Sequence, residues 1–231
     1  MDLDGKKICI WGDSIMKGVI LDESNGKYRI PEDNYVDNFA RLSGCNIENH
    51  ASFGMTTTKA LGRIIHSVEK TPPEQADIVL LEYGGNDCDY RWNEVSAAPE
   101  ANHLPKTPLD VFSETLQNII GIFKKYCITP VFMNLPPIEP KRYFDWITRG
   151  LNAGNILKWL GDVNKIYRWQ ELYNNIASEV AHRNGCPIVD VRKKFLETRD
   201  YPALFCSDGI HPNALGQKRI LDTFLELSKA S

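Results

Sequence analysis

The chain has 231 residues and a formal net charge of −3 at pH 7, from 27 basic and 30 acidic side chains. This balance gives no electrostatic reason to expect nucleic acid or an anionic membrane as a partner. The length suits one domain, or at most two small ones, and we expect residues 1–231 to form a single domain.

Short apolar runs alternate with longer amphipathic runs along the chain, which is typical of a parallel sheet with crossover helices. The expected strands are Lys7–Trp11, Asn46–Asn49, Ile78–Tyr83, Pro130–Asn134 and Pro187–Val191. The expected helices are Ile15–Leu21, Tyr35–Ser43, Thr57–Val68, Pro108–Tyr126, Lys165–Asn184 and Ala214–Lys229. Pro72–Pro73 and Asn184–Gly185 are helix-stop signals. The order of elements predicts a three-layer α/β fold with a five-stranded parallel sheet, in the flavodoxin-like strand order 2-1-3-4-5.

Small or polar residues follow the first three expected strands. Ser14 comes after the first strand, Gly54 after the second and Asn86 after the third. Because ligands bind at the carboxyl ends of parallel strands, we expect these residues to converge on one crevice. Asp208 and His211 precede the last helix, and their spacing puts both side chains on one side of a tight turn. A serine, a histidine and a carboxylate are the groups that acyl transfer to serine requires.

These residues lie in four separated blocks, Gly12-Asp-Ser14 with Gly18, Asn49 to Gly54, Gly84-Gly-Asn-Asp87, and Asp208-Gly-Ile-His211-Pro-Asn. In this order the blocks resemble those of the SGNH hydrolases, also called GDSL esterases and lipases. The resemblance implies Ser14 as nucleophile, His211 as base and Asp208 as the acid that orients the base. It also implies an oxyanion hole formed by the Ser14 N–H, Gly54 and Asn86. No Gly-x-Ser-x-Gly elbow surrounds Ser14, which argues against an α/β-hydrolase fold.

The activity that follows is hydrolysis of a small-molecule carboxylic ester through an acyl-serine intermediate, with no cofactor. Among possible substrates, we expect a short acyl group on a carbohydrate. Lipid acyl hydrolysis, thioester hydrolysis and acyl transfer to another alcohol remain open. Outside the enzymes, the alternative is a carbohydrate-binding module that has the fold but lacks turnover. The sequence does not indicate an oligomeric state.

Two segments, 88–107 and 136–164, exceed ordinary connections in length and leave the sheet at the edge of the candidate site. Both are rich in aromatic side chains, among them Trp92 and Trp146, which are the candidate substrate-binding residues. The alternative is that these rings only pack the two segments against the body of the protein.

Several other polar residues are expected to have structural roles. Asp13 and Asp87 should accept backbone N–H groups and hold their loops. The short basic cluster 192–194 is expected on a solvated face. Glu82 lies within an apolar run, and the sequence offers no account of it. His50 and the other histidines outside the motif have no partner at metal-ligand spacing, so we predict no metal site.

The six cysteines form no Cys-x-x-Cys pair, so neither a zinc site nor a redox motif is indicated. Residues 1–7 lead directly into the first apolar run, which leaves no room for a signal peptide. No apolar run approaches the roughly 18 residues of a membrane span. We therefore expect a cytoplasmic protein with reduced cysteines, unless a leader has been removed.

Overall fold

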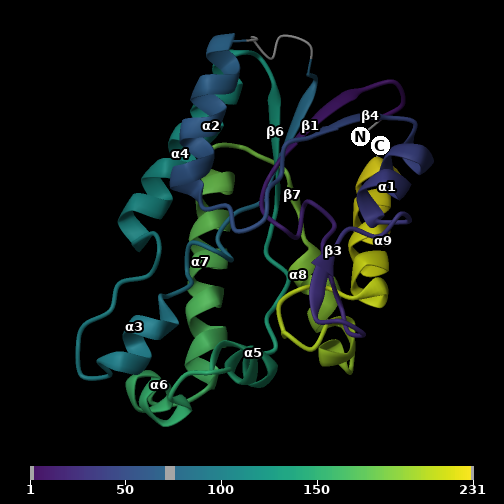
Figure 1. Ribbon diagram of the computed structural model, residues 1–231. Helices are drawn as coiled ribbons and strands as arrows, with labels where there is room; N and C mark the ends of the chain where they lie inside the picture. The colour runs from purple at the N-terminus through teal and green to yellow at the C-terminus, as the bar shows by residue number, and fades with distance from the viewer. Residues whose placement is uncertain (1–2, 71–75, 230–231) are drawn as a thin grey trace.

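Five parallel strands form the centre of the structure, a computed structural model that describes residues 3–70 and 76–229 (Figure 1). They are β1 (Lys7–Trp11), β4 (Asn46–Asn49), β5 (Ile78–Leu81), β6 (Thr129–Met133) and β7 (Ile188–Val189). The strands lie in the order β4-β1-β5-β6-β7, which confirms the predicted order 2-1-3-4-5 and the three-layer α/β fold. The last strand is shorter than predicted because Asp190 accepts the Lys193 N–H and begins a helix.

Helices cover both faces of the sheet, because the strands are apolar on both sides. In β5, Ile78 and Leu80 face one apolar cluster, whereas Val79 and Leu81 face the other. The first cluster is covered by α1 (Tyr35–Ser43), α8 (Val191–Leu196) and α9 (Ala214–Lys229). The second is covered by α2 (Thr57–Lys70), α4 (Leu109–Lys125) and α7 (Asn164–Arg183). Figure 1 shows α2, α4 and α7 on one side of the strands and α1 and α9 on the other.

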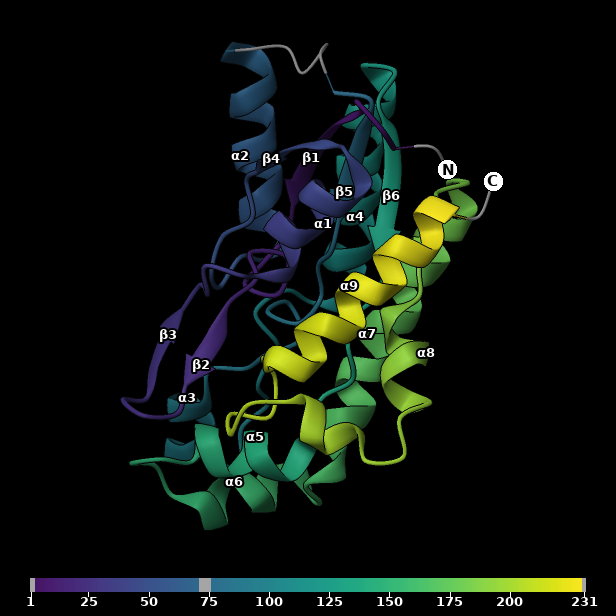
Figure 2. The same cartoon turned by 90° about the vertical axis from the view of Figure 1, so that its right-hand side faces the viewer.

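Two helical insertions extend the structure beyond the carboxyl ends of the strands. The first carries α3 (Trp92–Ala97), and the second carries α5 (Pro140–Ile147) and α6 (Ala153–Leu160). They pack on each other and on the start of α7 around a third apolar cluster. Figure 2 shows α5 and α6 at the end of the molecule toward which the β6 arrow points. The two long segments of the sequence therefore lie at the predicted edge of the sheet.

The segment after Ser14 differs from the sequence expectation, because the helix predicted over Ile15–Leu21 is wrong. A short turn leads to Gly18, whose φ of +75° is left-handed and ends any regular helix. The chain then forms an antiparallel hairpin of β2 (Ile20–Asp22) and β3 (Lys27–Arg29). The overlooked signal is Asn25-Gly26, a common turn dipeptide of β-hairpins.

The other predicted helices are present, with ends that differ by a few residues. α7 ends at Arg183, and Gly185 has a φ of +62°, which confirms the Asn184–Gly185 stop. The Pro72–Pro73 signal lies outside the described residues. A short 3-10 helix, η1 (Tyr201–Leu204), precedes the turn at 206–211. Within the described residues, no helix is long and apolar enough to cross a membrane.

The basic cluster 192–194 was expected on a solvated face, and this expectation is wrong for Arg192. Its side chain is buried and forms an ion pair with Glu171. The guanidinium also donates to Gln170 Oε1 at 2.9 Å and to the backbone oxygens of Leu135 and Pro136 at 3.1 and 3.3 Å. Arg192 therefore fastens the loop after β6 to α7. The sequence could not show this, because all four of these partners lie more than 20 residues away.

Candidate active site

Ser14, His211 and Asp208 form a continuous hydrogen-bonded series, although 197 residues separate the serine from the histidine. His211 Nε2 lies 2.9 Å from Ser14 Oγ, and His211 Nδ1 lies 2.6 Å from Asp208 Oδ2. The three side chains are 6%, 2% and 0% exposed in the order Ser14, His211 and Asp208. When the Nδ1 proton is donated to Asp208, the Nε2 lone pair faces the serine hydroxyl and can accept its proton.

A tight turn places Asp208 and His211 on the same side of the chain. Asp208 Oδ1 accepts the N–H groups of Ile210 at 3.1 Å and of His211 at 3.0 Å. Gly209 has a φ of +75°, and a Cβ there would lie 2.6 Å from the Glu139 carbonyl oxygen. Burial alone would raise the pKa of Asp208, but the His211 hydrogen bond and charge and the backbone N–H groups together lower it. The carboxylate is therefore ionised at neutral pH and can stabilise an imidazolium.

The turn after β1 places Ser14 at the carboxyl edge of the sheet. A Cβ on Gly12 would lie 2.8 Å from the Met16 side chain, so this turn requires glycine. Asp13 accepts the Ile15 N–H at 2.8 Å. Asp87 accepts the N–H and the hydroxyl of the first residue of α2 at 2.9 and 2.6 Å. These contacts confirm the expectation that both carboxyl groups hold their loops.

Ser14 and His211 open into a cavity of about 420 Å³ at this edge. Gly54 and Asn86 line the same cavity, so the predicted convergence of the strand ends is confirmed. Gly54 has a φ of +67° and no atom within 4 Å of an added Cβ, so the backbone conformation rather than space favours glycine there. The Asn86 amide donates one hydrogen to Asp13 Oδ2 at 2.8 Å, which leaves its second amide hydrogen available.

The two helical insertions provide part of the cavity wall. Trp92 and Trp146 both line the cavity, together with Tyr90 and Tyr143. Trp92 Nε1 donates to a carboxylate oxygen of Asp89 at 2.8 Å, and the Arg149 guanidinium lies 3.9 Å from the centre of the Trp146 ring. Trp92, Tyr90 and Tyr143 also belong to the third apolar cluster, as does Trp159, which does not line the cavity. The two alternatives are therefore not exclusive, because the same rings line the cavity and pack the insertions.

The β2–β3 hairpin supplies a cavity residue that the sequence analysis missed. Tyr28 lines the cavity, and its ring centre lies 4.8 Å from that of His211. Phe53 stacks on the same imidazole with ring centres 5.9 Å apart. Glu23 links the hairpin to the turn at 206–211 by accepting the N–H and the hydroxyl of Ser207 at 2.7 and 2.6 Å. Recognition of the Asn25-Gly26 turn would have predicted the hairpin but not its contact with His211.

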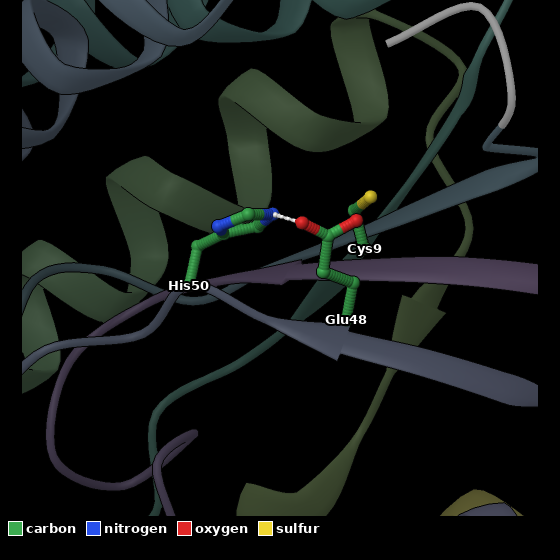
Figure 3. Close-up of side chains that lie close together, drawn as sticks. All are labelled: Cys9, Glu48 and His50. Atoms are coloured by element: carbon green, nitrogen blue, oxygen red, sulfur yellow. Dashed lines mark ion pairs between the residues drawn. The ribbon is translucent and has the colours of Figure 1, made fainter.

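One group among the described residues has the side-chain types of a metal site (Figure 3). Ligand atoms of Cys9, Glu48 and His50 lie within 4.8 Å of one another, because Cys9 and Glu48 are register partners on β1 and β4. Figure 3 shows the Glu48 carboxylate between the other two, with His50 Nε2 3.1 Å from Glu48 Oε1. None of the three lines the cavity.

The electrostatics of this group do not favour a bound cation. Burial and the charge of Glu48 raise the pKa of the Cys9 thiol to about 11, so an ion would have to displace its proton. The Arg63 guanidinium lies over Trp11, which stacks on His50, and so places a positive charge nearby. The contact between His50 and Glu48 accounts for the group, and we assign no metal.

Comparisons of sequence identify related proteins. A sequence model of the GDSL-like Lipase/Acylhydrolase family matches residues 10–219. The chain is 22% identical over 184 residues to the GDSL esterase/lipase CPRD49 of Arabidopsis thaliana, covering 77% of this chain and 64% of that protein. It is 21% identical over 197 residues to the GDSL esterase/lipase WDL1 of Oryza sativa subsp. japonica, covering 84% and 68%. The chain thus spans about two thirds of the length of these plant proteins.

Solved structures share the fold. A catalytic mutant of Axe2, an acetylxylan esterase from Geobacillus stearothermophilus, matches with a TM-score of 0.70 at 19% identity, covering 100% of this chain and 98% of that chain. A GDSL-like lipase from Bacteroides thetaiotaomicron VPI-5482 matches with a TM-score of 0.63 at 14% identity, covering 97% and 88%. At these identities the likeness concerns the fold, and it agrees with the α/β fold expected from the order of the elements.

Proposed function

We propose, because this chain belongs to the GDSL-like lipase/acylhydrolase family, that it hydrolyses carboxylic esters through an acyl-serine intermediate. Family membership agrees with the resemblance seen in the four sequence blocks. The observation that carries the proposal is the unbroken hydrogen-bonded series from Asp208 through His211 to Ser14 at a cavity. These are the groups that serine acyl transfer needs, in the order that it needs them.

In the proposed first half of the reaction, Ser14 Oγ attacks the ester carbonyl carbon while His211 Nε2 takes its proton. Asp208 stabilises the imidazolium that forms. The Ser14 N–H, the Gly54 N–H and the Asn86 amide bind the oxyanion of the tetrahedral intermediate. The intermediate then collapses, and the departing alcohol takes the proton from His211.

In the second half, water replaces the alcohol beside the acyl-serine. His211 removes a proton from this water as it attacks the acyl carbon, and the same donors bind the second oxyanion. The C–O bond to Ser14 breaks, Ser14 Oγ regains a proton from His211, and the acyl group leaves as a carboxylic acid. Acyl transfer would differ only in the attacking group, which would be a second alcohol.

For the substrate, we propose a short acyl group on a carbohydrate. Aromatic faces such as those of Trp92 and Trp146 suit a sugar ring. Polar groups at the same cavity suit its hydroxyls, among them Asp89 and Lys106, which form an ion pair at 2.8 Å. The acetylxylan esterase among the fold neighbours points to the same substrate class. Lipid esters, thioesters and a second alcohol are the alternatives that the assay must compare.

We further propose that residues 1–231 act as one domain in the cytoplasm. The third apolar cluster includes the start of α7, so the insertions pack on a helix of the central layers. All six cysteines are free, which suits a reducing compartment. Limited proteolysis tests the first statement, since a single domain yields no stable fragments. Fractionation of the source cells tests the second.

Replacing the nucleophile tests the proposed mechanism. Ser14→Ala should fold normally but lose turnover of p-nitrophenyl acetate, and a fluorophosphonate probe should label the wild type at Ser14. Ser52→Ala is the matched control, because this serine lies near the site but outside the cavity lining, and it should keep both activity and labelling. Activity in the Ser14→Ala variant, or labelling at another residue, would contradict the mechanism. Comparison of acetylated xylo-oligosaccharides with long-chain esters and thioesters then tests the substrate class.

Replacing the amide tests the proposed oxyanion hole. Asn86→Ala should lower kcat by about 10² to 10³ with KM little changed, because the lost donor acts mainly on the charge of the transition state. Steady-state kinetics with p-nitrophenyl acetate measure both constants. A rise in KM at constant kcat would instead assign Asn86 to binding of the ground state.

A further inference from the structure

Glu82 is a buried acid that the proposed reaction does not use. It follows β5 directly, its side chain is fully buried, and it lines the cavity. Within the described part of the chain, its Oε1 has no hydrogen-bond partner. Its Oε2 accepts the Asp13 backbone N–H at the long distance of 3.5 Å. A buried carboxyl group with so few donors is costly to ionise.

Asp13 links Glu82 to the candidate oxyanion hole. Asp13 Oδ2 accepts the Asn86 amide at 2.8 Å, and Oδ1 accepts the Ile15 N–H at 2.8 Å. Two close N–H groups therefore favour the charged form of Asp13, whereas Glu82 accepts only the long contact from the Asp13 N–H. Both carboxyl groups are buried and share a hydrogen bond between their side chains, so they are not ionised together.

The pKa shifts agree with this assignment of charge. Burial and the charge and hydrogen bonding of Asp13 raise the pKa of Glu82 well above its ordinary value. Burial also raises the pKa of Asp13, against the lowering effects of Ile15, Glu82, His211 and Asn86. The other titratable groups that face this pair are Tyr35, Tyr83 and Asp87. The tyrosines are neutral at neutral pH, because burial and the charges of Glu82 and Asp13 raise their pKa values.

We propose that neutral Glu82 is a positioning residue that donates a hydrogen bond to the Asp13 carboxylate and so keeps the Asn86 amide aimed at the oxyanion. A charged Asp13 accepts the amide N–H and repels the amide oxygen, so it selects one of the two amide orientations. In that orientation the second N–H stays free for the substrate oxygen. Without the proton donor at position 82, Asp13 would take up the proton itself and lose this selectivity.

This inference rests on the proposed function, because it assigns Asn86 to the oxyanion hole. A donor to the oxyanion must be fixed before the reaction, since reorienting a dipole during the reaction raises the barrier. Replacing Glu82 should therefore change kcat rather than KM, and only in proteins that retain Asn86.

A double-mutant cycle tests the link between Glu82 and Asn86. Glu82→Gln retains an N–H donor of the same shape and should keep kcat for p-nitrophenyl acetate within about threefold of wild type. Glu82→Leu should lower kcat by about tenfold or more, with KM within about threefold. In the Asn86→Ala background, Glu82→Leu should change kcat by less than about twofold, because its effect passes through the missing amide.

Two further variants keep the test decisive. Gln170→Leu removes another buried polar side chain of the cavity that has no bond to Asp13 or Asn86, so it should change kcat by the same factor in both backgrounds. Asp13→Asn should reproduce the kcat loss of Glu82→Leu and its dependence on Asn86, and it replaces that variant if Glu82→Leu does not fold.

Three results would overturn the inference. The first is that Glu82→Leu or Asp13→Asn lowers kcat by the same factor in the wild-type and Asn86→Ala backgrounds. The second is that Glu82→Gln lowers kcat as much as Glu82→Leu does, and the third is that the variants change only KM. Ser14→Ala in the same assay separates this failure from that of the proposed function. If Ser14→Ala is active, the esterase mechanism is rejected. If Ser14→Ala is inactive and the effects of the Glu82 and Asn86 substitutions on kcat are independent, only the role of Glu82 is rejected.

Discussion

Replacing Glu82 by glutamine should stabilise the protein increasingly as the pH rises from 5 to 7. In the unfolded chain this carboxyl group loses its proton near the ordinary pKa of 4.5, whereas in the folded protein its pKa is well above that value. Unfolding therefore releases a proton, and the free energy of unfolding falls by about 1.4 kcal/mol for each pH unit over which the folded protein holds it. Glutamine has no such proton, so the stability difference should grow by about 1.4 kcal/mol for each pH unit until the pH reaches the folded-state pKa of Glu82.

Urea denaturation of wild type and Glu82→Gln at pH 5, 6 and 7 measures this difference. Asp87 and the other titrating groups occur in both proteins, so their own pH dependence largely cancels. Glu114→Gln is the matched control, because it makes the same chemical change at an exposed position of α4, where no buried carboxyl group is lost. A constant difference for Glu82→Gln, or one that shrinks as the pH rises, would show that Glu82 is ionised in the folded protein.

Two further predictions concern the cavity wall and the loop after β6. Trp146→Ala should raise KM for an acetylated sugar several-fold while sparing p-nitrophenyl acetate, because a remote contact contributes mainly to binding of the larger substrate. An equal loss on both substrates with a lower melting temperature would show that Trp146 only packs the insertion. Arg192→Met should lower the free energy of unfolding by about 1 to 3 kcal/mol, because it leaves Gln170 and the Leu135 and Pro136 backbone oxygens without their buried donor. Its exposed neighbour is the control: Lys193→Met should stay within about 0.5 kcal/mol of wild type in the same urea denaturation.

The architecture of the sheet could be predicted from the sequence because it depends on local patterns. Apolar runs of strand length separated by amphipathic stretches allow few solutions other than a parallel sheet covered on both faces. The same pattern places residues that follow strands at one edge, which is why Ser14, Gly54 and Asn86 were expected together. The four sequence blocks that resemble those of the SGNH hydrolases predict that Asp208 and His211 lie beside these residues.

The helix wrongly predicted after Ser14 shows the limit of local patterns. A mostly apolar stretch of seven residues, such as 15–21, suits either a helix or a strand, and periodicity alone does not separate the two. The left-handed Gly18 and the Asn25-Gly26 turn decide in favour of a hairpin. Whether that hairpin contacts His211 depends on the bonds between Glu23 and Ser207, which are 184 residues apart.

Periodicity and short motifs are local, so they are sufficient to predict the fold class, the order of the strands and the candidate catalytic residues. The surroundings of those residues depend on contacts between distant segments and become visible only in the folded protein. The burial of Arg192, the pairing of Cys9 with Glu48 and His50, and the contact of Glu82 with Asp13 all join separate elements. The charge state of a side chain depends on the groups that the fold places around it, and neighbours in space are not neighbours in the chain.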